Sequence, residues 1–190
     1  MKGGADRSPT FVLSVREEGA KLPLPKKRLV DLTALTFRVA DREPGDVSLV
    51  VSDDGFIAAL NEKYLRERGP TDVLSFPLRE GPGEKPPRPS RRGSPKTRSF
   101  RPTPRAAVSS RRASTKTSGW QSGYLGDIVI SVDTAGLQAK AAGKKLAEEF
   151  LLLYLHGLLH LLGFTHDTAR DGAEMVEMQR SILSGGDTGR

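Results

Sequence analysis

The chain has 190 residues, of which 36% are hydrophobic and 6% aromatic, and a formal net charge of +7 at pH 7. This length suits one domain with a real core, and the low hydrophobic content indicates that part of the chain lies outside that core. Because there is no cysteine, a disulfide scaffold, a thiolate zinc site and a cysteine nucleophile are excluded. The lack of cysteine is compatible with a reducing cytosolic setting. The first residues lack an apolar stretch, so no secretory signal is expected.

In chain order, hydrophobic periodicity first predicts a strand at residues 11–15 and a helix at 29–39. A β-branched strand follows at 47–51, and Asp53 or Asp54 is expected to cap the next helix, which reaches Tyr64. The later predictions are strands at 73–76 and 124–131 and helices at 133–143, 145–162 and about 175–183.

This order predicts an α+β fold: a single domain with a mixed sheet of about four strands and about five helices. The apolar stretch at residues 150–164 is fifteen residues long. A membrane span needs about 18 or more apolar residues, so we expect a buried core helix and no membrane partner. The domain is predicted to comprise residues 1–78 and 123–190.

Residues 79–122 differ in composition from the rest of the chain. They hold twelve Lys or Arg against two Glu, a local charge of +10, whereas the remainder has 18 basic and 21 acidic groups. A Pro-, Ser- and Arg-rich stretch cannot bury enough apolar area to offset its backbone entropy, so a disordered insertion is predicted. Two interpretations stay open: a tether for a phosphate backbone, or a tolerated surface loop.

The three histidines of the chain all lie within eleven residues. His156 and His160 are four apart in an apolar helical run, so both imidazoles lie on one helix face. Gly163 can end that helix, since glycine takes the left-handed conformation at little cost, and His166 then approaches from a third direction. The spacing predicts one Zn²⁺ per chain, held by these histidines on a buried C-terminal helix and its exit loop, with an open fourth position typical of enzymes.

The same H-x-x-x-H-x-x-G-x-x-H spacing occurs in metzincin proteases. Their residue after the first histidine is a glutamate that acts as general base, whereas this chain has Gly157. Without that carboxylate, the group that would deprotonate a zinc-bound water is missing. A zinc peptidase therefore stays as an alternative that the sequence disfavours.

Residues 156–166 (HGLLHLLGFTH) resemble the signature of the YbeY family of zinc-dependent endoribonucleases, the ribosomal RNA maturation factors. The segments LNEKY with PTDVLSFP, at 60–64 and 70–77, and LGDIVIS, at 125–131, also agree with that family. The resemblance implies a compact α+β fold, one zinc ion held by the three histidines, and action on single-stranded RNA in the cytoplasm. It also implies maturation of the 16S rRNA 3′ end and quality control at the small ribosomal subunit.

Three departures from the family pattern bear on the site. Leu65 stands where the family commonly has an arginine thought to face RNA, so that role moves to Arg66 or Arg68 or is lost. Thr165 replaces the usual aspartate before the last histidine, and Asp167 follows it. The third departure is the insertion itself, which is far longer than the family's usual connection.

The resulting hypothesis is metal-assisted cleavage of an RNA phosphodiester. Arg66 or Arg68 would bind phosphate or stabilise developing charge. Asp127 and Asp167 are candidate partners for imidazole N–H groups, although Asp127 could instead cap local backbone at a strand end. The nucleophile (water or the RNA 2′-hydroxyl), the general base and the oligomeric state are left open. A second alternative is a ribosome-assembly factor with structural zinc, in which the insertion binds RNA.

Overall fold

A computed structural model of the chain describes residues 11–78 and 123–185, which all belong to one unit formed by Met1–Arg79 and Ser122–Arg190. The predicted insertion at 79–122 lies outside the described residues. The elements in chain order are β1 (Leu13–Glu18), α1 (Lys26–Val39), β2 (Asp46–Ser52), α2 (Asp54–Tyr64), β3 (Val73–Pro77), β4 (Tyr124–Ser131), α3 (Val132–Ala141), α4 (Leu146–Leu161) and α5 (Ala169–Gly185).

Four strands form one mixed sheet in the order β1-β2-β4-β3. The first three are parallel to one another, and β3 runs antiparallel to β4 at one edge, with Leu74 opposite Val129 and Pro77 opposite Gly126. This arrangement confirms the predicted α+β class with a four-stranded mixed sheet and five helices. No helix in residues 11–78 and 123–185 combines the length and the apolar character that crossing a membrane requires.

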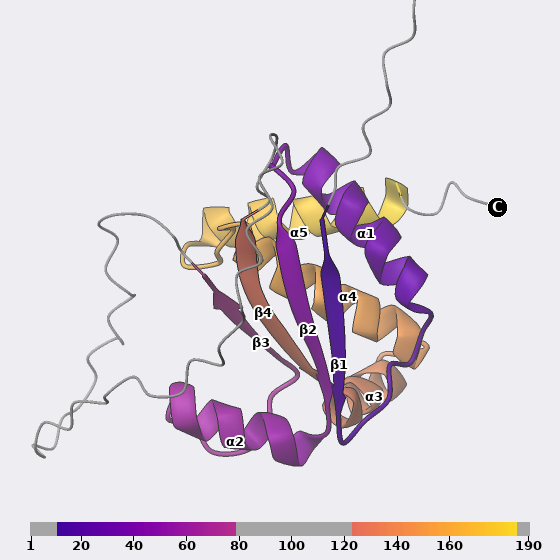
Figure 1. The fold of residues 1–190 in the computed structure, drawn as a ribbon, viewed down its shortest axis with the longest axis vertical. Helices are drawn as coiled ribbons and strands as arrows, with labels where there is room; N and C mark the ends of the chain where they lie inside the picture. The colour runs from indigo at the N-terminus through magenta and orange to yellow at the C-terminus, as the bar shows by residue number, and fades with distance from the viewer. Residues whose placement is uncertain (1–10, 79–122, 186–190) are drawn as a thin grey trace, which may run out of the picture. The chain divides into compact units, whose positions relative to one another are not determined.

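Helices cover both faces of the sheet (Figure 1). Val47, Leu49, Ile128 and Ile130 point to the main core, which they share with α1, α4 and α5, whereas Val129 points to a smaller cluster. The smaller cluster also contains Val50, Ile57, Leu74 and the partly buried Phe56, Leu60 and Phe76. Because successive side chains of a strand point to opposite faces, β4 supplies both clusters from adjacent residues.

The first strand differs from the predicted one. It begins at Leu13 rather than residue 11, and Phe11 instead packs its ring edge against Phe37, with centroids 5.4 Å apart. The strand also continues to Glu18, which pairs with Ser52 of β2. Pairing with a long parallel partner therefore extends β1 through polar residues that hydrophobic periodicity does not mark.

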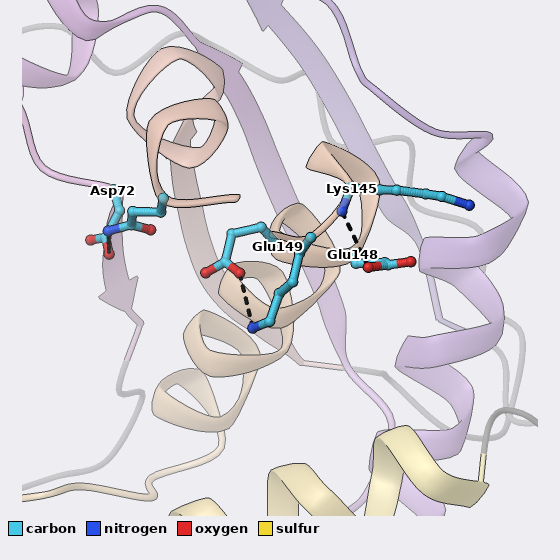
Figure 2. Close-up of polar contacts among 6 residues, drawn as sticks. Asp72, Lys145, Glu148 and Glu149 are labelled. Atoms are coloured by element: carbon cyan, nitrogen blue, oxygen red, sulfur yellow. Dashed lines mark hydrogen bonds and ion pairs between the residues drawn. The ribbon is translucent and has the colours of Figure 1, made fainter. Parts of the chain in front are cut away.

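Local hydrogen bonds fix where the helices begin. Asp53, one of the two expected caps, accepts from the backbone N–H of Phe56 at 2.8 Å and is the N-cap of α2. At the start of α4 the carboxylate of Glu148 accepts from the Lys145 backbone N–H at 3.2 Å (Figure 2). The next residue, Glu149, is buried and accepts from Lys144 Nζ at 3.3 Å. These contacts hold the helix that carries two of the histidines.

Candidate metal centre

The structure brings the three histidines together. His156 and His160 lie on the last turns of α4, and His166 comes from the segment between α4 and α5. One ligand atom from each ring lies within 4.8 Å of the others, and His156 Nε2 is 3.1 Å from His160 Nε2. The rings of His156 and His160 are half-buried, whereas His166 is exposed. The cluster therefore has one side toward the core and one toward solvent.

Gly163 makes this convergence possible, as the sequence predicted. Its φ is +91°, in the left-handed region that favours glycine. The backbone N–H of Phe164 donates back to the carbonyl of Leu159 at 3.0 Å, and that of Gly163 donates to the carbonyl of His160, also at 3.0 Å. This pair of bonds closes the end of α4 and reverses the chain, so that His166 returns to the helix end.

Two further groups orient the imidazoles. His160 Nδ1 lies 3.0 Å from the carbonyl oxygen of Phe164, to which it donates in the Nδ1–H tautomer. That tautomer leaves the lone pair on Nε2, the atom that faces His156. His156 Nδ1 is 3.1 Å from the side-chain amide of Gln179 on α5, whose oxygen accepts from an Nδ1–H when the amide is turned. Both rings can then present Nε2 to a common ion.

These residues fit a divalent metal such as zinc. Three neutral imidazoles are a known zinc donor set that leaves a fourth position open. Two ligands about 2.0–2.1 Å from an ion at a tetrahedral angle lie about 3.3 Å apart, close to the Nε2–Nε2 distance of 3.1 Å. Hydrogen bonds from the second ring nitrogen to a carbonyl or amide are the usual support for such ligands.

The local electrostatics favour the neutral form of His156 and His160. Burial lowers the pKa of His156 below its ordinary value of 6.5, the neighbouring His160 and His166 lower it further, and Asp72 acts in the opposite direction. Burial also lowers the pKa of His160, aided by His166 and opposed by the Phe164 carbonyl and Asp167. Neutral rings at neutral pH have the free lone pairs that a metal requires.

Gly157 occupies the position at which metzincins carry their catalytic glutamate. A Cβ on this residue would lie 2.9 Å from Ile128 Cγ2 and 3.0 Å from Ser75 Oγ, because α4 packs closely against β3 and β4 there. The Ser75 hydroxyl also donates to the Gly157 carbonyl at 3.4 Å. A carboxylate has no room at this position and would point into the sheet, which argues against a metzincin-like peptidase.

The other predicted site residues are not hydrogen-bonded to the histidine rings. Asp127, one of the two candidate partners for an imidazole, forms no hydrogen bond with a histidine ring of the described residues. Strand alternation sends its side chain to the face away from α4, where it accepts from the Tyr124 hydroxyl at 2.7 Å. Arg66 and Arg68 are exposed in the segment between α2 and β3, and Asp167 is exposed beside His166. Among the described residues, none of these four donates to or accepts from a histidine ring.

Sequence reasoning missed Gln179. It lies four residues after Met175 and three before Ile182, which are both buried on the inner face of α5. A polar side chain on an apolar helix face is a signal that could have identified it. The Phe164 carbonyl could not be found in that way, because its position depends on the reversal at Gly163.

Comparison with known proteins places the chain in a family. The family model described as Endoribonuclease YbeY matches residues 21–186. The chain belongs to the YbeY family of endoribonucleases. It is 36% identical to the protein named Endoribonuclease YbeY from Clavibacter michiganensis subsp. michiganensis (strain NCPPB 382), and the match covers 84% of this chain and 83% of that protein. It is also 36% identical to the protein of the same name from Moorella thermoacetica (strain ATCC 39073 / JCM 9320), over 90% of this chain and 95% of that protein.

A solved structure supports the YbeY fold. The solution structure of a protein from Thermotoga maritima superposes with a TM-score of 0.51 at 18% identity, covering 93% of this chain and 99% of that one. At this identity the likeness concerns the fold alone. Membership of the YbeY family makes the chain a nuclease of the hydrolase class with RNA as its substrate.

Proposed function

We propose that this chain is a zinc-dependent endoribonuclease that cuts single-stranded RNA and holds one Zn²⁺ through His156, His160 and His166. The observation that carries the proposal is the convergence of three imidazoles at the end of α4 in a chain of an endoribonuclease family. Bound zinc would supply a polarised phosphoryl oxygen and a more acidic water. The cellular role we propose is maturation of the 16S rRNA 3′ end and quality control of the small ribosomal subunit in the cytoplasm.

The protein's own groups have separate tasks in this proposal. The Phe164 carbonyl and the Gln179 amide hold the ring nitrogens that do not face the ion. The buried wall of Leu158, Leu159 and Leu161 keeps the helix end rigid. Arg66 is the proposed phosphate contact, supported by its exposure and its fixed positive charge. No carboxylate is assigned as general base, so the attacking group is water or the RNA 2′-hydroxyl.

Cleavage of a labelled single-stranded RNA by zinc-loaded protein tests the proposal directly. The native protein and a Val176→Ala variant, which changes an exposed apolar side chain of α5, should both cut. His160→Ala should lose zinc and cleavage together, because two imidazoles cannot hold the site. Full zinc occupancy in His160→Ala would contradict the ligand assignment.

The same assay separates the alternatives. If the native protein binds zinc but cuts no RNA, alone or in small subunits that carry 3′-extended 16S rRNA, an assembly factor with structural zinc is favoured. Casein cleavage that EDTA abolishes would favour a peptidase, against the closed position of Gly157.

We also propose that the basic insertion at 79–122 tethers RNA. The residues on either side of it leave the sheet near the metal centre: Leu78 donates its N–H to Leu125, and the adjacent Gly126 packs against Leu161 of α4. Replacing 79–122 by a short Gly/Ser linker should weaken RNA binding and flatten its salt dependence, since fewer counterions are released. An unchanged salt slope would favour the tolerated-loop interpretation.

A further inference from the structure

An exposed aromatic side chain ends α2. Tyr64 is 55% exposed although it is a large partly apolar residue. Its ring meets that of Phe76 on β3 edge to face, with centroids 5.2 Å apart. Lys63 Nζ lies 4.9 Å from the centre of the Tyr64 ring. An aromatic pair with an adjacent cation, open to solvent, is the arrangement on which proteins stack the bases of single-stranded nucleic acids.

The backbone around this pair is held in place. Asn61 is buried one turn before the end of α2, and its side-chain amide donates to the carbonyl of Gly69 at 3.1 Å. The Leu65 N–H donates to the Asn61 carbonyl at 2.9 Å. Phe76 packs against the smaller hydrophobic cluster. The aromatic surface is therefore fixed before any ligand binds, which lowers the entropic cost of stacking.

The segment that follows supplies positive charge at some conformational cost. Residues 62–70 are all exposed, and Arg66 and Arg68 lie among them. Arg66 has a φ of +61°, in the left-handed position after a helix where glycine is the usual residue. An arginine at this strained position suggests a role for its side chain.

The topology relates this surface to the metal centre. β3 is an edge strand, and its successive residues point to opposite faces: Ser75 toward Gly157 of α4, next to His156, and Phe76 toward α2. Helices α4 and α2 cover opposite faces of the sheet (Figure 1), so the histidine cluster and the aromatic pair lie on the two sides of this edge. An extended strand of RNA that crosses this edge would reach both regions.

We propose that Tyr64 and Phe76 form a stacking site for one nucleobase of single-stranded RNA, several nucleotides from the cleaved bond, with Lys63 and Arg66 beside its phosphates. The inference rests on the proposed endoribonuclease function and adds a subsite to it. The site explains a preference for unpaired RNA, because only an unstacked base can insert against Tyr64.

The test uses the full-length zinc protein and single-stranded RNAs of increasing length, each also made with one 5-iodouridine at successive positions. Tyr64→Ala should weaken binding and raise KM for long RNAs about 5- to 100-fold, with kcat unchanged. Dinucleotides, which cannot reach the site, should show no difference. Tyr64→Phe should retain tight binding, and Leu137→Ala, an exposed apolar change on α3, should behave as the native protein. Irradiation should crosslink Tyr64 to iodouridine at one distance from the cut.

The outcomes separate the subsite from the function itself. If the native protein cuts RNA and Tyr64→Ala matches it at every length, with no crosslink at Tyr64, the stacking site is wrong and the endoribonuclease proposal stands. If the native protein neither binds nor cuts any of the RNAs, both are overturned. A loss in Tyr64→Ala that Tyr64→Phe shares would also reject stacking, since phenylalanine keeps the aromatic face.

Discussion

The metal centre and the RNA-binding region that we propose differ in how they are built. The histidine cluster stands at the end of α4, whose neighbouring leucines are buried, and its rings are held by a carbonyl and an amide. The region around Tyr64 and Arg66 is exposed and lies on the other side of the sheet edge. Metal ligands need positions fixed to a fraction of an ångström, whereas groups that receive a flexible RNA need access. Changes in the first region should therefore affect stability or metal, and changes in the second should affect RNA binding.

The largest expected effect comes from filling the position of Gly157. Gly157→Glu would force a side chain into Ile128 and Ser75 and bury a charge, so we expect a loss of unfolding free energy above about 3 kcal/mol. Gly157→Ala should cost less, because a single methyl needs a smaller shift. Gly136→Glu on α3, where no atom lies within 4 Å of the added Cβ, is the control and should keep near-native stability. Urea unfolding of the three variants measures this, and a stable Gly157→Glu protein would contradict the close packing.

The next effect is on metal affinity without loss of the fold. Gln179→Ala removes the amide beside His156 Nδ1 and should weaken zinc binding about 10- to 100-fold. Gln138→Ala removes a similar half-buried amide, which donates to Asp72 at 2.9 Å, and should leave zinc affinity near the native value. Competition with a zinc-binding dye gives both numbers. Equal affinities in the two variants would mean that Gln179 does not orient the ligand.

A third change should separate stability from RNA binding. Arg66→Gly removes the strain of a non-glycine residue in the left-handed conformation, so it should raise the unfolding free energy by up to about 1 kcal/mol. The same change should weaken RNA binding. Asp41→Gly is matched to it, because Asp41 has a φ of 51° after α1. That variant should show a smaller gain in stability, since aspartate tolerates this conformation, and no change in RNA binding. Thermal melts and RNA titrations of both proteins test the distinction; tighter RNA binding by Arg66→Gly would reject the phosphate contact.

Local patterns predicted most of the fold and the clustering of the three histidines. The helices follow from periodicity, and the three histidines with Gly163 form one contiguous motif whose geometry depends on a single helix end. Gln179 could not be placed in the same way, since it reaches His156 from another helix, twenty-three residues along the chain. Placing Gln179 beside His156 requires knowing how α5 packs on α4, and a local sequence pattern does not contain that tertiary information.

Asp127 shows a second limit of sequence reasoning. Ile128, Val129 and Ile130 after it are all buried, because both faces of β4 are covered by helices. In such a strand the apolar pattern does not alternate, so it cannot tell which face a neighbouring polar residue shares. The contacts of Gly126 with Leu161 and of Ile128 with Gly157 show that the even-numbered residues face α4 and that Asp127 does not.

The smallest expected effect lies at the opposite end of the sheet from the histidines. Asp54, the first residue of α2, accepts hydrogen bonds from Ser131 Oγ at 2.5 Å and Thr134 Oγ1 at 2.7 Å, which lie at the start of α3. The Ser131 bond is the main cause that lowers the pKa of Asp54 below its ordinary 3.8. A carboxyl with a lowered pKa stabilises the folded state above its unfolded pKa and loses that contribution as pH falls through the folded value. The native protein should therefore lose stability below about pH 4 relative to Asp54→Asn, by less than about 1 kcal/mol because the group is largely solvated. Thermal melts from pH 7 to 3 measure the difference; parallel curves would mean that Asp54 links α2 and α3 without its charge.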